Sequence, residues 1–453
     1  MEGTLAQAAL TMHGRLRGED RAFRGVSTDT RSLAAGELFF ALKGPNFDGA
    51  AFVEVAAERG AAGAVVQSEL AADISTITVP DTLQALGLLS AAWRQRLEVT
   101  MVGITGSNGK TTLKEMVASC LSLSASTLAT QGNLNNEIGV PLMLAKLSAD
   151  HRYAVIEMGA NHAGEIARLT DLVEPKIVAI TNAAPAHLEG FGSIEGVARA
   201  KGEILTGDVP PEVVILNADD EFFPYWSSLV PVSRVSSFGL APQADFRASD
   251  VYATETGSNF TLRMPHGELQ ISLPLYGAHN VLHACAAAAI AASLGIDDRQ
   301  IKQGLETVRP VSGRLQSVRS SSGDTLYDDS YNANPVSVIA AAKFLAAQPG
   351  TSWLILGDMA ELGIDAEEMH AAVGRDLKNV GIDHLLATGE LSRLTVDAFG
   401  DRGHWFATQD ELVDSLRDSL DGNNNVLVKG SRSSGMERVV QALRDATDEA
   451  GGG

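Results

Sequence analysis

The feature that most constrains this chain is a glycine-rich turn between an apolar strand and an amphipathic helix. The run Val99–Ile104 is typical of a buried strand, and it leads into the turn Gly103-Ile-Thr-Gly106-Ser-Asn-Gly109-Lys-Thr-Thr112. The apolar side chains that follow recur at three- and four-residue spacing, which predicts a helix with one buried face: Leu113, Met116, Val117, Cys120 and Leu121. A strand, a glycine turn and a helix in this order are typical of a phosphate-binding loop.

The residue types in this turn suit a nucleoside triphosphate and its magnesium ion. Glycines let successive backbone N–H groups face phosphate oxygens, and the helix N-terminus adds partial positive charge. Lys110 would reach the β- and γ-phosphates, and Thr111 would offer its hydroxyl to Mg²⁺. Ile104 stands where the usual motif has its first glycine, so the spacing is G-x-x-G-x-x-G-K-T-T. We still expect ATP or GTP to bind here, through Gly106, Ser107, Asn108, Gly109, Lys110, Thr111 and Thr112.

Strand and helix signals alternate through the rest of the chain, which favours parallel sheets with helices on both faces. The predicted strands of the second and third blocks include Tyr153–Ile156, Ile177–Ile180, Val213–Leu216, Trp353–Leu356, His384–Ala387 and Val426–Val428. A helix should close the first block at Leu83–Leu97, and another should begin at Pro335, capped by Asn334, and end before Gly350. We therefore expect an α/β protein with three domains: a small α/β substrate-binding domain (1–98), a central P-loop parallel-sheet ATPase domain (99–310) and a C-terminal Rossmann-like domain (311–453).

Polar residues follow several of these strands, and they suggest where a site forms. Glu157, Asn182, Asp358 and Lys429 each come directly or shortly after a predicted strand. Open parallel sheets bind ligands beyond the carboxyl ends of their strands, so a site between the two larger sheets is expected. A carboxylate such as that of Glu157 suits a hard cation like Mg²⁺.

Composition limits the possible partners and the compartment. The 453 residues include 35 Lys+Arg and 56 Asp+Glu, a formal net charge of −21, which argues against nucleic acid or an anionic membrane as a partner. Cys120 and Cys285 form neither a disulfide framework nor a metal knuckle, which favours a reducing compartment. The longest apolar run, Ala284–Ala292, is too short to span a bilayer. We expect a soluble cytoplasmic protein without membrane insertion.

Motifs throughout the second and third blocks resemble the Mur ligase family, the ATP-dependent amide-forming enzymes of peptidoglycan synthesis. They include GITGSNGKTT from Gly103, TQGNLNNEIGVPL from Thr130, IEMGANHAGEI from Ile156, TNAAPAHLEGFGS from Thr181, AKGEI from Ala200, GAHN from Gly277, YDDSYNANPVS from Tyr327, LGDMAELG from Leu356 and VKGSRSSGME from Val428. The segment from Val26 to Ala51 resembles the family's UDP-sugar-binding domain. YNANP and LGDMAELG favour the branch that adds D-alanyl-D-alanine, and the DNPR-type motif expected of the preceding ligase is absent.

The resemblance implies a role for particular residues. Lys110 and Thr111 would bind ATP phosphate and Mg²⁺, Glu157 and His187 would contact the metal, and Lys201 would be a carbamylated lysine that completes the metal site. Around the nucleotide the resemblance places Asn280, Asp328 and Tyr331, with Arg314 swinging onto the γ-phosphate as the third domain closes. UDP-N-acetylmuramoyl-tripeptide would meet Ser27, Thr28, Asp29, Arg31, Asn46 and Asn135, and D-Ala-D-Ala would meet Asn332, Asn334, Lys429, Ser431 and Arg432.

The implied reaction activates the terminal carboxylate of the tripeptide as an acyl phosphate, which the amine of D-Ala-D-Ala then attacks, so that phosphate leaves. Two alternatives within the same chemistry are a sibling Mur ligase and a folylpolyglutamate synthase-like ligase. From another class, a P-loop switch protein would bind nucleotide to change partners. A monomer is expected.

Overall fold

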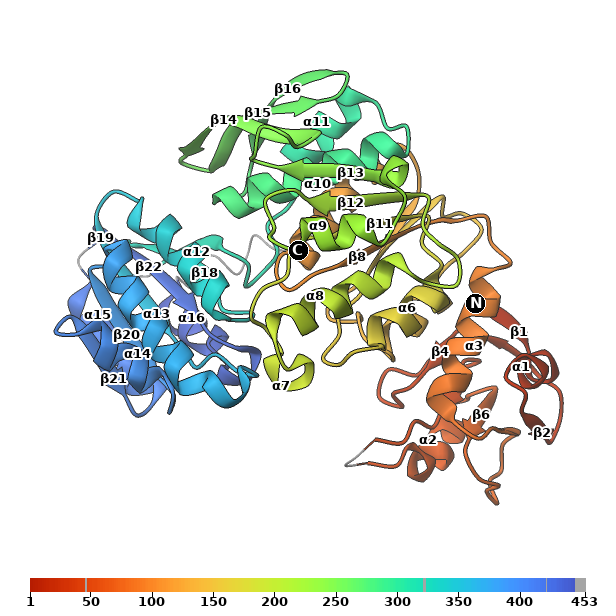
Figure 1. Ribbon diagram of the computed structural model, residues 1–453. Helices are drawn as coiled ribbons and strands as arrows, with labels where there is room; N and C mark the ends of the chain where they lie inside the picture. The colour runs from red at the N-terminus through yellow and green to blue at the C-terminus, as the bar shows by residue number, and fades with distance from the viewer. Residues whose placement is uncertain (45–46, 321–322, 421, 445–453) are drawn as a thin grey trace.

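The computed structural model describes residues 1–44, 47–320, 323–420 and 422–444, which form three main β-sheets covered by helices (Figure 1). These sheets draw on residues 15–78, 100–273 and 316–429 in turn. In Figure 1 the first sheet lies at the lower right, the second at the top and centre, and the third at the left. The predicted α/β architecture is confirmed, whereas the division of the chain at residues 98 and 310 stays a prediction.

The N-terminal sheet has the order β2-β7-β6-β5-β4, parallel except for β2 at its edge, and β1 pairs separately with β3. Phe40 packs in the core beneath α1 and α3, and Phe39 packs against α2, so the sheet is covered on both faces. The predicted helix Leu83–Leu97 is α3, which begins at Thr82 because Asp81 caps it. The elements are β1 Glu2–Thr4, α1 Leu5–Thr11, β2 Arg15–Arg17, β3 Ala22–Arg24, β4 Val26–Ser27, β5 Leu38–Phe40, α2 Val53–Glu58, β6 Gly63–Val66, β7 Thr76–Thr78 and α3 Thr82–Arg94.

The central sheet has nine strands in the order β16-β15-β14-β13-β12-β11-β8-β10-β9. Val102 and Ile104 face a core closed by α4, α10 and α11, whereas Met101 faces a second core closed by α5, α6, α8 and α9. The strands are β8 Thr100–Thr105, β9 Thr127–Ala129, β10 Tyr153–Glu157, β11 Ile177–Ile180, β12 Val213–Asn217, β13 Val235–Gly239, β14 Phe246–Thr254, β15 Gly257–Met264 and β16 Gly267–Leu273. The helices are α4 Lys110–Ser122, α5 Gly139–Ala145, α6 Glu165–Val173, α7 Leu188–Phe191, α8 Ile194–Gly202, α9 Phe223–Ser228, α10 Ala278–Ser293 and α11 Asp298–Glu306.

The predicted parallel central sheet is confirmed for β8 to β14, whereas β15 and β16 add an antiparallel edge that was not predicted. Strands β14, β15 and β16 form antiparallel hairpins, joined by two-residue turns. The available signal was alternation, because Phe260, Leu262 and Met264 are buried on one face of β15. Six parallel strands, β8 to β13, precede the hairpins in the chain, and the hairpins extend the sheet away from the phosphate-binding turn.

The third sheet has the order β17-β18-β22-β19-β20-β21, and only β17 runs antiparallel. Helices α12, α13 and α14 cover one face, and α15 and α16 cover the other. Asn334 caps α12 as predicted, and the helix ends at Ala346, four residues before Gly350. The elements are β17 Gln316–Arg319, β18 Thr325–Asp329, α12 Pro335–Ala346, β19 Thr351–Leu356, α13 Ala366–Val380, β20 His384–Thr388, α14 Ser392–Phe399, β21 Gly403–Phe406, α15 Gln409–Ser419, β22 Asn424–Lys429 and α16 Glu437–Leu443.

Two sets of contacts join the three sheet regions. Helix α3 attaches the N-terminal sheet to the central one: Arg94 pairs with Glu174 at 2.7 Å, and the indole of Trp93 donates to the carbonyl of Leu147 at 2.9 Å. The third sheet meets the central one through the loops after β18 and β19. Within the described ranges, no helix has the length and apolar character needed to cross a bilayer.

Candidate active site

A cavity of about 680 Å³ lies between the central and third sheets. Its walls come from the phosphate-binding turn, the loops after β10 and β11 and the start of α10 on one side, and from the loops after β18, β19 and β22 on the other. All of these loops leave the carboxyl ends of parallel strands, except the turn into α10. The expectation of a site between the two sheets therefore agrees with the geometry.

The conformation of the phosphate-binding turn is fixed by its glycines and by hydrogen bonds to the loop after β11. Gly106 (φ 143°) and Gly109 (φ 80°) adopt backbone conformations that favour glycine, and a Cβ on Gly109 would collide with the ring of His283. The backbone N–H groups of Ser107 and Asn108 donate to the carbonyl and the side-chain oxygen of Asn182, at 2.9 and 3.0 Å. Contacts with Asn182 and the conformations of its own glycines therefore fix the shape of the turn without a bound ligand.

Lys110 is the cation at the centre of this turn. Its ammonium donates to the carbonyls of Gly106 at 2.7 Å and Ser107 at 3.2 Å, and burial lowers its pKa, with Arg314 acting in the same direction and Glu157 opposing it. Backbone carbonyls are weak partners that an anionic phosphate would replace. Thr111 and Thr112 follow Lys110 in α4 and line the cavity.

Glu157 ends β10 and is buried, with 2% of its surface exposed. Its backbone N–H donates to Thr130 Oγ1 at 2.9 Å, and its Oε1 accepts from the side chain of Asn135 at 2.7 Å. Its Oε2 is buried without a hydrogen-bond partner among the described residues. Because an unpartnered carboxylate oxygen is costly unless something binds it, this atom fits a magnesium ion.

His187 lies in the loop after β11, directly before α7, and Lys201 lies in α8. The Nδ1 atom of His187 contacts the carboxylate of Glu361 in the loop after β19, while burial lowers the pKa of the ring, Glu361 opposing this and Lys110 adding to it. Lys201 is 1% exposed, and its Nζ lies 5.2 Å from the centre of the Phe191 ring. Burial lowers the pKa of Lys201 to about 7, assisted by the charge of Lys110.

Two arginines of the third region stack on the ring of Tyr331. The guanidinium carbon of Arg314 lies 4.2 Å from the ring centre, and that of Arg432 lies 5.7 Å from it. All three side chains line the cavity, and Arg432 also pairs with Glu437 at 3.3 Å. Stacking preorganises both cations beside the phosphate-binding turn.

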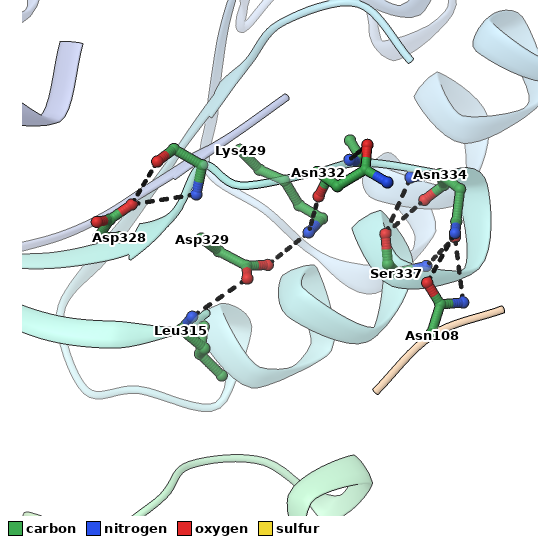
Figure 2. Close-up of polar contacts among 10 residues, drawn as sticks. Asn108, Leu315, Asp328, Asp329, Asn332, Asn334, Ser337 and Lys429 are labelled. Carbon is green, nitrogen blue, oxygen red and sulfur yellow. Dashed lines mark hydrogen bonds and ion pairs between the residues drawn. The ribbon is translucent and has the colours of Figure 1, made fainter. Parts of the chain in front are cut away.

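Several predicted ligand-binding residues instead make bonds within the protein. The buried carboxylate of Asp328 accepts from the N–H groups of Gly313 and Ser330 and from the Ser330 hydroxyl, at 3.2, 3.1 and 2.6 Å. Lys429 is 3% exposed and donates to Asp329 at 2.6 Å and to the carbonyl of Asn332 at 2.9 Å (Figure 2). The ammonium of Lys429 is therefore already paired, which leaves Arg432 as the freer cation for a carboxylate.

The other predicted residues of the cavity also form hydrogen bonds within the protein. The Asn280 amide donates to the carbonyl of Tyr276 at 2.7 Å, and Ser431 Oγ lies 2.8 Å from Ser434 Oγ. Asn334 and Asn108 pair through their side-chain amides (Figure 2). Asn280, Ser431, Asn332 and Asn334 all line the cavity.

The residues predicted to hold a UDP group lie apart from this cavity, at the end of β4 and in the loop that follows it. Asp29 forms a two-bonded pair with Arg31, whose Nη2 lies 2.6 Å from Oδ2 and Nε 3.0 Å from Oδ1, and this hydrogen bonding lowers the pKa of Asp29 to about 2. The Ser27 hydroxyl donates to the carbonyl of Asp29 at 3.0 Å, and Thr28 lies between these two residues. Asn46 lies outside the described residues.

Sequence reasoning missed four residues that shape the site. Thr130 fixes the backbone of Glu157, Glu361 contacts His187, His283 packs behind Gly109, and Asp329 pairs with Lys429. Thr130 follows directly after β9, so the rule of polar residues at strand ends could have found it. His283 lies on the largely apolar helix α10, where the sequence pattern predicts only burial. The position of Glu361 in the sequence does not indicate that it contacts His187.

Family models match three stretches of this chain. The Mur ligase family catalytic domain matches residues 22–94, the Mur ligase middle domain matches residues 104–291, and the Mur ligase glutamate ligase domain matches residues 313–432. A curated relative from Escherichia coli (strain K12), named UDP-N-acetylmuramoyl-tripeptide–D-alanyl-D-alanine ligase, is 43% identical over 445 residues, which cover 98% of each chain.

Solved structures resemble the whole molecule as well. A crystal structure of MurF from Acinetobacter baumannii is 35% identical, covers 98% of this chain and 99% of its own, and has a TM-score of 0.93. MurF from Thermotoga maritima, solved in complex with ADP, has a TM-score of 0.82 at 24% identity, covering 94% of this chain and 98% of its own, and supports the shared fold.

Proposed function

This chain belongs to the Mur ligase family, and we propose that it joins D-alanyl-D-alanine to UDP-N-acetylmuramoyl-tripeptide at the expense of ATP. The main support for this proposal is similarity to the E. coli ligase that is named for this reaction, at 43% identity over 98% of both chains. It is an ATP-dependent ligase of peptidoglycan synthesis, and the products are UDP-N-acetylmuramoyl-pentapeptide, ADP and phosphate.

The first chemical step forms an acyl phosphate. An oxygen of the tripeptide's terminal carboxylate attacks the γ-phosphorus of ATP, and ADP leaves. Lys110 and Arg314, whose side chains line the same cavity from opposite sides, would balance the charge that spreads over the transferring phosphoryl group. Backbone N–H groups of the phosphate-binding turn would hold the remaining phosphate oxygens.

The second step forms the amide bond. The amine of D-Ala-D-Ala attacks the activated carbonyl carbon, the tetrahedral intermediate expels phosphate, and the amine gives up its proton. Arg432 and Ser431 would receive the dipeptide's carboxylate; in support, Arg432 keeps an exposed guanidinium and both residues line the cavity. Water would hydrolyse the acyl phosphate, which is why the reaction needs a cavity enclosed between two sheets.

A magnesium ion fits the residues around Glu157. Its orphan Oε2, the Thr111 hydroxyl and His187 would hold the ion, which would supply positive charge beside the phosphates. His187 would have to leave Glu361 to do so.

Lys201 would complete the metal site as a carbamate. No carboxylate pairs with its ammonium in the ranges that the structure describes, and a pKa of about 7 leaves much of the amine neutral at neutral pH. A neutral amine adds CO₂ and loses a proton, which converts a cation into an anion. Such a group would attract a metal ion that an ammonium repels.

Two proposals concern the rest of the molecule. The UDP group would meet Ser27, Thr28, Asp29 and Arg31 at the end of β4 and in the following loop, and Asn135 beside Glu157 would contact the peptide end. A cytoplasmic location is supported by the use of ATP and by two buried cysteines without a disulfide, and the monomeric state stays a prediction.

The proposed function is tested by phosphate release from ATP. Release should require UDP-N-acetylmuramoyl-tripeptide and D-Ala-D-Ala together, and Lys110→Ala should abolish it because no other cation lies within the turn. A P-loop switch protein would hydrolyse nucleotide without either substrate. A sibling ligase or a folylpolyglutamate synthase-like enzyme would turn over with a single amino acid in place of the dipeptide, and that result would overturn the assignment.

A further inference from the structure

The side chains of Asn108 and Asn334 pair directly although they lie 226 residues apart. The Asn334 Nδ2 atom donates to Oδ1 of Asn108 at 2.7 Å, and the reverse contact from Asn108 Nδ2 to Asn334 Oδ1 is 3.5 Å (Figure 2). We propose that Asn334 is a positioning residue for the phosphate-binding turn: it holds Asn108 only when the third region is docked. The inference rests on the proposed function, in which that turn binds ATP.

The backbone of Asn108 is fixed on its own side of the cavity. Its N–H donates to Asn182 Oδ1 at 3.0 Å, and its carbonyl accepts from the Thr181 hydroxyl at 2.6 Å. Gly109, the next residue, is the left-handed cap of α4. Because these bonds occupy the backbone of Asn108, its side-chain amide is the group that contacts Asn334 of the third region.

Asn334 is equally constrained by the helix that it caps. Its Oδ1 accepts from the N–H of Ser337 at 2.9 Å, and its own N–H donates to Ser337 Oγ at 3.0 Å, a reciprocal capping box. Oδ1 is thus occupied by the helix, while Nδ2 remains for Asn108. One side chain therefore caps α12 and contacts the phosphate-binding turn at the same time.

The loop that carries Asn334 is also linked by hydrogen bonds to the segment that carries Arg314. Lys429 binds the carbonyl of Asn332 and the carboxylate of Asp329, and Asp329 accepts from the N–H of Leu315 at 3.1 Å (Figure 2). Leu315 follows Arg314 directly. Hydrogen bonds within the third region thus connect Arg314, the proposed cation for the γ-phosphate, with Asn334, the amide that contacts the turn.

A double-mutant cycle tests the pair. Asn108→Ala removes one partner, and Asn334→Ser keeps a good N-cap but is too short for the amide contact. Each single variant should weaken MgADP binding, measured by calorimetry, and raise KM for ATP by roughly three- to tenfold, as expected for losing one neutral hydrogen bond. The double variant should bind MgADP no more weakly than whichever single variant has the lower affinity. Effects that add in the double variant would overturn the proposal.

Ser337→Ala is the matched control, since it removes the capping-box hydroxyl and leaves both asparagines in place. It should lower thermal stability without the change in MgADP affinity, and an equal loss of affinity would assign the effect to the cap and refute the pair. Small-angle scattering gives a readout independent of turnover: MgADP should compact the wild-type chain more than either single variant. If the wild-type protein binds MgADP but does not ligate the dipeptide, the proposed function is refuted. The double-mutant cycle would still test the asparagine pair, because it measures MgADP affinity and not ligation.

Discussion

At the scale of single residues, three buried or half-buried lysines have three different environments. Lys110 donates to backbone carbonyls, Lys429 is paired with Asp329 at 2.6 Å, and Lys201 faces the ring of Phe191. A buried ammonium is costly without a compensating anion. Lys429 has one in the protein, Lys110 would gain one from phosphate, and Lys201 would gain relief by becoming a carbamate.

Lys201→Ala should therefore be inactive and should recover part of its activity when short carboxylates such as formate or acetate are added, because they would replace the carbamate. Wild-type protein incubated with ¹³C-bicarbonate should show a carbamate carbon signal by NMR that the variant lacks. With a pKa of about 7, the amine is mostly protonated at pH 6 and mostly neutral at pH 8, so the signal should be stronger at pH 8.

Lys176→Ala is the matched control for this experiment. Lys176 forms an exposed ion pair with Glu212 at 3.1 Å and should be dispensable for turnover. Full activity of Lys201→Ala without added carboxylate, or an unchanged carbon signal in that variant, would contradict the carbamate role.

At the scale of elements, α11 crosses α4 at a glycine. A Cβ on Gly304 would lie 2.5 Å from the Cα of Cys120 and 2.8 Å from its sulfur, and Ser119 donates to the carbonyl of Gly304 at 2.7 Å. Gly304→Ala should lower the free energy of unfolding by about 1–3 kcal/mol through overpacking, measured by urea denaturation. Gly267→Ala, where a methyl group meets open space, should change it little.

Cys120 gives a second readout of the same crossing. Burial raises the pKa of its thiol to about 12, so it should react slowly with thiol reagents in the wild type. Faster labelling of Cys120 in Gly304→Ala would report that α11 has lifted from α4. Equal stability and equal labelling in the two glycine variants would show that the crossing tolerates a methyl group.

At the scale of the whole molecule, the N-terminal sheet is attached to the central one beside the end of α3. Arg94 pairs with Glu174 at 2.7 Å and donates to the carbonyl of Leu172 at 3.1 Å, with 9% of its surface exposed. Arg94→Ala should loosen this attachment and raise KM for UDP-N-acetylmuramoyl-tripeptide several-fold, while KM for ATP stays near the wild-type value. The reason is that the proposed UDP loop and the ATP cavity lie in different parts of the molecule.

Arg96→Ala, two residues further along and exposed, should leave both Michaelis constants unchanged. If Arg94→Ala raised KM for ATP as much as that for the UDP substrate, the attachment would matter for the whole fold rather than for the N-terminal sheet.

The fold class and much of the site could be predicted because their signals are local. Gly106 and Gly109 adopt backbone conformations that favour glycine, and Glu157 ends an apolar strand that the sequence pattern predicts. The antiparallel hairpins β14–β16 were missed because alternation over a few residues is a weaker signal than an apolar run. The cap at Asn334 was predicted, but its second partner, Asn108, was not.

The sequence by itself determined the phosphate-binding turn, the strands that end in polar residues and the family. It did so because turn geometry and burial periodicity depend on residues close together in the chain. Only the tertiary structure decided which polar groups are already satisfied. Lys429 and Asp329 are 100 residues apart, and Asn108 and Asn334 are 226 apart, so no local pattern records their pairing. A side chain's charge or amide is most available to a ligand when folding has left it without a strong partner, and that depends on the distant segments that fold beside it.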